Sequence, residues 1–177
     1  MKAWAKIAAG TGTFLIADLI AFKIFEESEA LTKWLDAQNY CSSVGKQLLN
    51  IGCGNNPRFI GDVNVDIRQS ILPNSVIYDL NLPLPYGDKQ FGACVAFHIL
   101  EHLDNPKNVL SEMSRVADRA YIAIPSYLNL ISLVLPTHKW VFFNSDFCSL
   151  APFKAMLGSA LIMAAGASLI YCSVKKR

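Results

Sequence analysis

Residues 47–56 read QLLNIGCGNN, a short apolar run followed at once by two glycines. The run at 47–51 has the length and composition of a buried strand. Gly52 and Gly54 allow the chain to turn sharply and to approach a ligand with no side chain in the way. A strand that leads directly into such a turn favours an α/β fold with a ligand site beside the glycines.

Further short apolar runs follow the glycine turn. A helix is predicted at 108–116, where Val109, Met113 and Val116 recur at helical spacing. The connection from residue 54 to residue 62 is too short for a full helix, so we expect a shortened fold. Short strands joined by crossovers indicate a parallel sheet. The further strands are predicted at 62–67, 76–80, 93–100 and 121–125.

An acidic residue, Asp66, stands at the end of the second predicted strand. A carboxylate at this point of a nucleotide-binding fold accepts hydrogen bonds from both hydroxyls of a ribose. Asp66 together with the glycine turn therefore predicts a site for a cofactor that contains a nucleoside.

Five segments resemble, in this order and spacing, the class I S-adenosyl-L-methionine (SAM) dependent methyltransferases. They are LLNIGCGNNP, NVDI, YDLNLPLPYGDKQF, HILEHLDNPKNVLSEMSRV and YIAIPS. The resemblance covers about residues 47–126. It implies a shortened Rossmann-like sheet, SAM as the cofactor and methyl transfer as the activity.

The resemblance also implies roles for single residues. Gly52 and Gly54 would lie under the methionine part of SAM, with Asn50 beside them facing its amino group. Asp79 and Leu80 would flank the adenine. The implied cofactor contacts are Asn50, Gly52, Cys53, Gly54, Asp66, Ile67, Asp79, Leu80 and His98, and the implied catalytic residues are His98, Glu101 and His102.

The chain has three histidines, His98, His102 and His138, and they are the candidates for a general base. Residues 98–102 also spell H-x-x-E-H, the inverted zinc-peptidase signature, but that alternative leaves the glycine turn unexplained. His138 alternatively belongs, with Trp140, to an aromatic belt at a membrane surface. The five cysteines are scattered, so we expect free thiols and no metal site.

Composition points to a membrane or a large partner. Hydrophobic residues make up 53 % of the 177 residues and charged residues 17 %, against usual values of about 45–50 % and about 25 %. The net charge of +2 is too small to indicate nucleic acid.

Apolar segments lie near both ends. Residues 155–174 carry no formal charge, and as a helix they would span about 30 Å, the thickness of a bilayer core. A buried soluble helix is the alternative. Residues 7–22 are apolar except for Asp18, and a short span, an interfacial helix and a signal sequence stay open for them.

These observations predict three parts: an apolar N-terminal helix at 1–29 that anchors the chain or lies in the interface, a SAM-binding domain at 30–150, and a transmembrane C-terminal helix at 151–177. The expected function is methyl transfer at a membrane to a small or lipid-like acceptor. The domain would face the cytosol, or the matrix or stroma of an organelle. The expected partners are membrane lipids and a membrane protein complex, and no nucleic acid.

A second hypothesis is a catalytically degraded, methyltransferase-like scaffold subunit of such a membrane complex. It rests on departures from the family pattern, such as Asn50 where many members carry an acid. Fold alone does not decide between the two.

Overall fold

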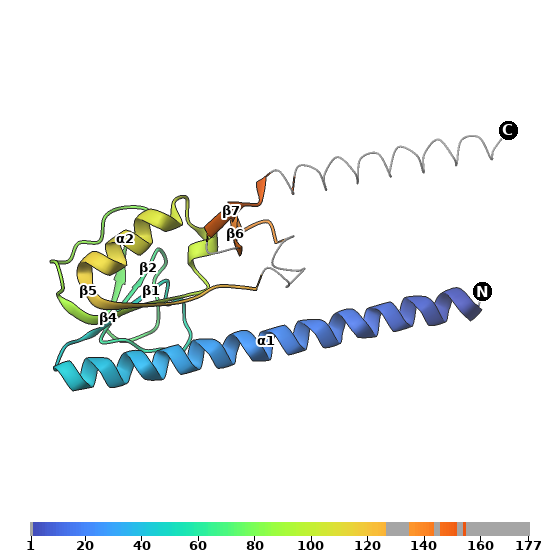
Figure 1. Cartoon of the computed structure of the whole chain (residues 1–177), viewed down its shortest axis with the longest axis horizontal. Helices are drawn as coiled ribbons and strands as arrows, with labels where there is room; N and C mark the ends of the chain where they lie inside the picture. Colours follow the sequence, from blue (N-terminus) through green and yellow to red (C-terminus); the bar gives the residue numbers. More distant parts are fainter. Residues whose placement is uncertain (1, 127–134, 144–145, 152–153, 155–177) are drawn as a thin grey trace.

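The computed structural model describes residues 2–126, 135–143, 146–151 and 154, with the backbone alone at 2–19, 143 and 146. A five-stranded sheet of order β3-β2-β1-β4-β5 lies at its centre (Figure 1), and all neighbouring strands are parallel. The parallel α/β sheet predicted from the sequence is confirmed. The strands are β1 (Leu48–Ile51), β2 (Val63–Asp66), β3 (Ser75–Ile77), β4 (Phe91–Phe97) and β5 (Ala117–Ala123).

Three strands differ in extent from the prediction. β4 begins at Phe91 and ends at Phe97, and the 3-10 helix η1 (Leu100–His102) follows, so the prediction of strand up to residue 100 is wrong. β3 is only three residues long. β5 begins earlier, at Ala117, because this polar stretch pairs with β4 at the sheet edge, where one side of the strand stays exposed.

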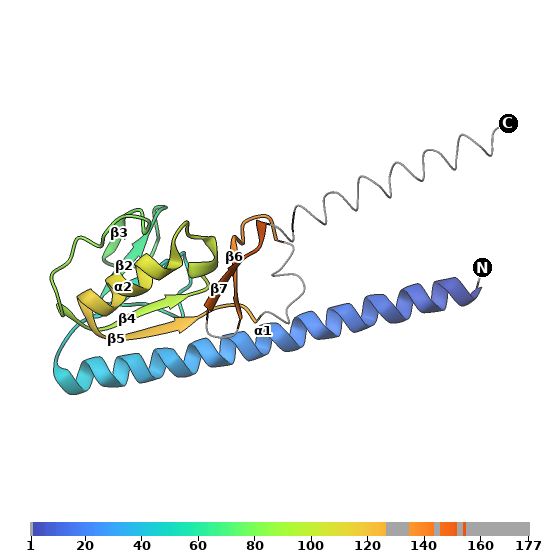
Figure 2. The ribbon, with the colours of Figure 1, turned by 45° about the horizontal axis from the view of Figure 1, so that its top comes forward.

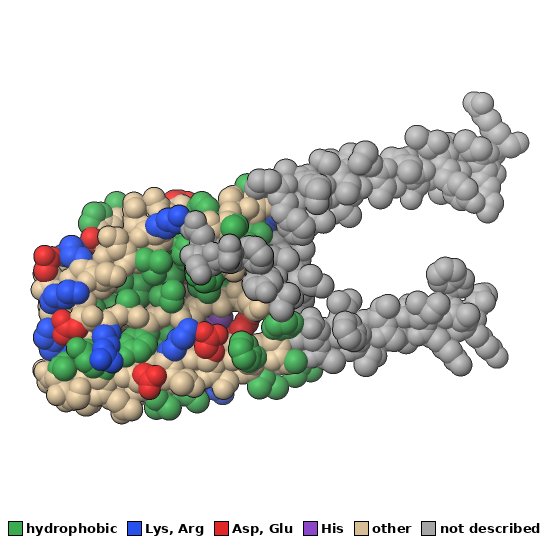
Figure 3. Space-filling view, viewed as in Figure 1, with side chains coloured by type: hydrophobic (Ala, Val, Ile, Leu, Met, Phe, Trp, Pro, Cys, Tyr) green, Lys and Arg blue, Asp and Glu red, His purple; other side chains and the backbone are tan. Residues whose placement is uncertain are grey.

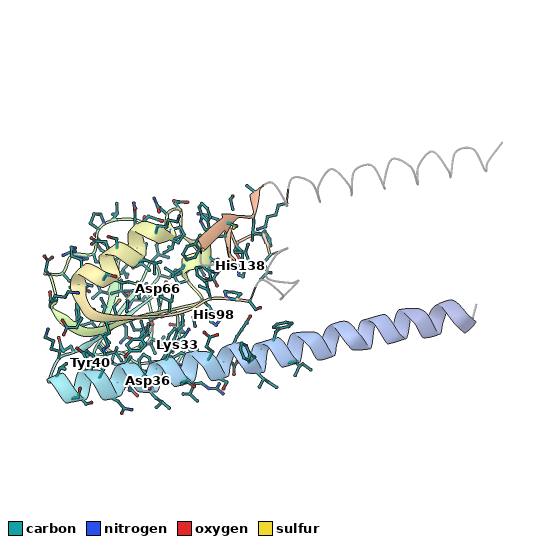
Figure 4. All side chains as sticks on the ribbon, in the orientation of Figure 1. Lys33, Asp36, Tyr40, Asp66, His98 and His138 are labelled. Atoms are coloured by element: carbon teal, nitrogen blue, oxygen red, sulfur yellow. The ribbon has the colours of Figure 1, made fainter. Side chains whose placement is uncertain are left out.

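Helix α1 (Lys2–Val44) covers one face of the sheet. Trp34, Ala37 and Cys41 recur at helical spacing and are buried with Leu48 of β1. Lys33 Nζ on the same helix donates to the carbonyl of Ile122, at 2.6 Å (Figure 4). The helix is continuous across the domain boundary predicted at residues 29 and 30.

Helix α1 is terminated by a glycine. Gly45 adopts a φ of +66°, and the Lys46 N–H donates to the Cys41 carbonyl at 3.1 Å. This is the pattern in which a left-handed glycine closes a helix and satisfies a free carbonyl. The chain is thereby turned directly into β1.

Helix α2 (Pro106–Val116) covers the opposite face, so the sheet lies between two helices (Figures 1 and 2). The predicted helix at 108–116 is confirmed and begins two residues earlier. The Asn105 side chain caps it by accepting from the Asn108 N–H at 3.2 Å.

An antiparallel pair, β6 (Trp140–Phe143) with β7 (Asp146–Ser149), was not predicted. It is bonded to the chain around η1. The Lys139 N–H donates to the Glu101 carbonyl at 2.7 Å, and Trp140 Nε1 donates to the Leu103 carbonyl at 2.8 Å. These bonds bring His138 to the end of the sheet where β4 stops.

Within the part of the chain whose side chains the structure describes, no helix combines the length and apolar character needed to cross a membrane. Of the apolar segment 7–22, the side chains of residues 7–19 fall outside that part. The predicted C-terminal helix at 151–177 lies outside the described residues except for positions 151 and 154.

Candidate functional site

The carboxyl ends of β1 and β4 form the candidate site. β1 has β2 on one side and β4 on the other, so the chain changes direction along the sheet at this pair. In open α/β sheets, ligands bind at the carboxyl ends of the strands beside such a switch point. Asp66 and His98, at the ends of β2 and β4, are labelled in Figure 4.

The glycine turn that follows β1 has the backbone that the sequence predicts. Gly52 and Gly54 adopt φ values of +68° and +53°, which few other residues tolerate. The Gly52 N–H donates to the Val65 carbonyl at 2.7 Å, which holds the turn to β2. A Cβ on Gly54 would meet no described atom within 4 Å, so this glycine faces open space.

Asp66 lies half-buried against the same turn. Its Oδ2 accepts from the Gly54 N–H at 2.8 Å, and its Oδ1 accepts from the Arg68 N–H at 3.0 Å. A carboxylate oxygen has more than one lone pair, so two ribose hydroxyls remain compatible with these bonds. Ile67, the next residue, is 61 % exposed and offers an apolar surface beside the carboxylate.

Asp79, just beyond β3, stabilises a turn. Its Oδ1 accepts from the backbone N–H and the side-chain amide of Asn81, at 2.9 and 3.0 Å. Both bonds go to Oδ1, so the capping role that is the alternative for this residue is present in the structure. The adenine contact of Asp79 stays a prediction.

Three of the predicted cofactor contacts have buried side chains. Asn50 is 3 % exposed, and its amide donates to the Phe59 carbonyl at 2.7 Å. Leu80 packs in the hydrophobic core. The side chain of Cys53 is also buried, and this burial raises the pKa of its thiol. Asn50 thus fastens the loop between β1 and β2.

His98 directly follows β4 and has a strained backbone conformation. Its φ is +54°, a region that a residue with a side chain occupies at a cost of about 1–3 kcal/mol. Its N–H donates to the Ala123 carbonyl at 2.8 Å. Burial lowers the pKa of the imidazole, so His98 is neutral at pH 7 and able to accept a proton.

His98 lines a groove of about 710 Å³ between α1 and the loop after β1. The α1 side includes the exposed apolar residues Ile24 and Leu31, and the loop side includes Arg58 and Phe59. Figure 3 shows hydrophobic side chains beside charged side chains of both signs on the face that it displays. The groove therefore offers apolar contact next to a proton acceptor.

Glu101 and His102 do not line this groove. Glu101 is 2 % exposed, and burial raises its pKa to about 7. Its Oε1 lies 3.9 Å from His98 Nδ1 and 3.9 Å from His102 Nε2. The ring of His138, which is also buried, lies 4.7 Å from that of His102 between centroids.

The zinc-peptidase alternative needs both histidines of H-x-x-E-H on one helix. The structure places His98 after a strand, at positive φ, and only residues 100–102 form a single 3-10 turn. The segment is therefore not the helix that this signature requires. His138, which sequence spacing did not connect to Glu101, joins the group through the residues that precede β6.

Comparison with known families agrees with this geometry. Residues 49–120 match the family model described as a methyltransferase domain. This part of the chain is thus similar to class I methyltransferase domains. The match begins in β1 and extends into β5, so the matched region contains the glycine turn, Asp66, His98 and α2. Members of the family typically use SAM. The comparisons with curated proteins and with solved structures found no match.

Proposed function

We propose that this chain is a SAM-dependent methyltransferase that acts at a membrane on a small or lipid-like acceptor. The observation that carries the proposal is the contact between Asp66 and Gly54, in which the glycine turn and a carboxylate meet at the switch point of the sheet. A ribose carries two neighbouring hydroxyl donors that suit such a carboxylate.

The residues present fit SAM at this edge of the sheet. Asp66 would hold the ribose, Gly54 would leave room above the turn, and Asp79 and the backbone of Leu80 would border the adenine. SAM supplies the methyl group from a sulfonium. The protein then has to hold the acceptor in line with the methyl group and accept a proton where the acceptor carries one.

His98 is the residue we assign to that proton. It is neutral at pH 7, it faces the groove, and it lies at the carboxyl end of β4. The imidazole would accept the proton that the acceptor's O–H or N–H loses when the acceptor is methylated. Glu101 and His102 do not line the groove, and we assign them no part in this step.

The proposed location of this protein at a membrane is supported by the sequence. The groove is bordered by α1, and α1 continues beyond the sheet toward its N-terminus (Figure 1). The apolar residues 7–22 belong to that continuation. A lipid-like acceptor held at the same surface would thus have a short path along the helix to His98. We place the domain on the side of the membrane where SAM is made, the cytosolic side.

A matched pair of variants tests the cofactor site. Asp66→Asn keeps the shape of the side chain but removes the charge that would bind the ribose. Hydrogen bonds to a charged group contribute about 1.5–3 kcal/mol each, so we expect SAM affinity to fall by more than about tenfold. Calorimetry with SAM and S-adenosylhomocysteine on the full chain is the measurement.

Asp62→Asn is the control. Asp62 precedes β2, and its Oδ2 accepts from the Leu48 N–H at 2.7 Å, so it resembles Asp66 in chemistry but lies at the opposite end of the strand. Its variant should bind SAM like the wild type. Equal affinity of folded Asp66→Asn and wild type would remove Asp66 from the site.

The alternative function is a scaffold subunit that has lost the cofactor. It is favoured by the packing of Ile99, whose side chain lies against Gly52 and fills the space beside that glycine. A wild-type chain that is folded and binds neither SAM nor S-adenosylhomocysteine would support the scaffold.

A further inference from the structure

Glu101 is a buried carboxyl group whose two oxygens have no hydrogen-bond partner among the described residues. Its side chain is 3 % exposed. A buried carboxylate without compensation is strongly destabilising, and such groups are paired with a cation, bound to a metal or protonated. The surroundings of Glu101 therefore have to supply one of these.

The neighbours of Glu101 are metal-binding groups. Glu101, His102 and His138 each offer one ligand atom, and these atoms lie within 4.8 Å of one another. Zinc bonds of about 2.0–2.1 Å in tetrahedral geometry place ligand atoms about 3.4 Å apart. Small side-chain rotations would close that difference, because the ligand atoms already lie within 4.8 Å of one another.

His102 is oriented as a ligand would be. Its Nδ1 lies 3.0 Å from the Thr137 carbonyl, and a carbonyl only accepts, so Nδ1 carries the proton. Nε2 then turns its lone pair toward Glu101, 3.9 Å away. A histidine that donates one ring N–H to a backbone carbonyl and offers the other nitrogen is the usual arrangement at protein-bound metals.

The two chain segments are held together independently of any ion. The hydrogen bonds from Lys139 N–H and from Trp140 Nε1 fix the residues around His138 to η1. A cavity of about 10 Å³ beside Glu101 and His138 has the size of about one water molecule. Glu101 and His138 therefore border a space that has room for one small ion or one water molecule.

We propose that Glu101, His102 and His138 bind one divalent transition-metal ion of the zinc class. Two imidazoles and one carboxylate suit zinc and its neighbours, whereas calcium and magnesium prefer oxygen ligands alone. The ion would fasten the segment that leads into β6 onto the methyltransferase domain. The proposal does not depend on SAM binding, since the groove lined by His98 contains none of the three ligands.

Zinc itself is the probe. The full chain, treated with EDTA and freed of it, is titrated with zinc chloride in a calorimeter, and bound zinc is counted by elemental analysis after gel filtration. We expect one zinc per chain. His138→Asn and Glu101→Gln should each weaken binding by at least about 100-fold, because even groups behind the ligands contribute 10–100-fold.

Asp104→Asn is the matched control. Asp104 lies close to the site and pairs with Lys139, but its side chain is 72 % exposed and it belongs to no ligand group. This variant loses a neighbouring negative charge and should keep the zinc affinity of the wild type. Circular dichroism checks that each variant is folded, and Glu101→Gln preserves the shape of the side chain.

Two results would overturn the proposal. One is the absence of stoichiometric zinc binding to the folded wild type, which would leave protonation of Glu101 as the compensation. The other is zinc binding that survives both ligand substitutions, which would place the ion elsewhere on the chain.

Discussion

Gly52 and Gly54 share a positive φ but differ in what surrounds them. A Cβ on Gly52 would lie 2.4 Å from Ile99 Cγ1 and 2.5 Å from Ile99 Cβ, while a Cβ on Gly54 would meet open space. The sequence predicts that a side chain at Gly52 would collide with the cofactor. In the structure, a side chain at position 52 would collide with Ile99 of the protein itself. Loss of SAM binding in Gly52→Val could therefore result from damage to the fold, and substitution of Asp66 tests the cofactor site more directly.

Alanine substitutions at Gly52 and Gly54 should separate the cost of a strained backbone from the cost of a steric clash with Ile99. Gly54→Ala should lower the free energy of unfolding by about 1–2 kcal/mol, the cost of a left-handed alanine. Gly52→Ala adds overpacking of about 1–3 kcal/mol to that strain. Chemical denaturation measures both. The double variant Gly52→Ala with Ile99→Ala should show a favourable coupling of about 1 kcal/mol or more, and strict additivity would show that Ile99 is not the obstacle.

Helix α1 is part of the domain core. Trp34 is 4 % exposed, and its ring lies 5.4 Å from that of Phe59 and 6.5 Å from that of Phe97. These three side chains come from the helix, from the loop after β1 and from the end of β4. The helix thus closes one face of the sheet and also supports the two segments that border the groove.

Removing the indole should show how much of the fold depends on this contact. We expect Trp34→Ala to lower the free energy of unfolding by about 3–5 kcal/mol, the usual range for a buried aromatic residue. Leu35→Ala is the control on the same helix, because Leu35 is 50 % exposed and should change stability by about 0.5 kcal/mol or less. Similar losses in the two variants, measured by urea unfolding, would contradict the packing role of α1.

The sequence predicted the elements whose hydrophobic pattern is strong and missed those whose pattern is weak. β1, β2 and α2 have regular apolar positions, and they form close to where they are predicted. The inner face of α1 consists largely of alanine and cysteine beside Trp34, so its contrast with the outer face is small. From the sequence alone, the residues of β6 resemble an aromatic patch, because the strand that pairs with them lies further along the chain.

The same limit applies to the site. Asp66 and the glycine turn are neighbours in the predicted sheet, so the sequence could place them together. His138 is far from Glu101 along the chain, and only the hydrogen bonds around Lys139 and Trp140 bring it close. No spacing motif could predict that cluster, which is why a metal site was not expected from the sequence.

At the scale of the whole molecule, the hydrophobic core ends where the sheet ends, whereas helix α1 extends beyond it. α1 runs along one face of the sheet and continues past its end (Figures 1 and 2). The basic residues Lys2, Lys6 and Lys175–Arg177 favour a cytoplasmic position for both ends, while the proposed cofactor SAM would reach the domain from the cytosol. Two complete spans would leave both ends on the side opposite the domain. We favour a first segment that lies in the interface, because Lys2 and Lys6 then stay on the side of the domain and only Lys175–Arg177 cross the membrane.

Fractionation tests this arrangement. Carbonate washing should leave the full chain in the membrane, and deletion of residues 153–177 should release most of it, because an interfacial helix holds the membrane less firmly than a span. In sealed vesicles, protease added from the non-cytosolic side should spare residues 48–126, and detergent should then expose them as a control. Cleavage of that region without detergent would place the domain on the exported side, where SAM is not made, and would count against the proposed methyl transfer.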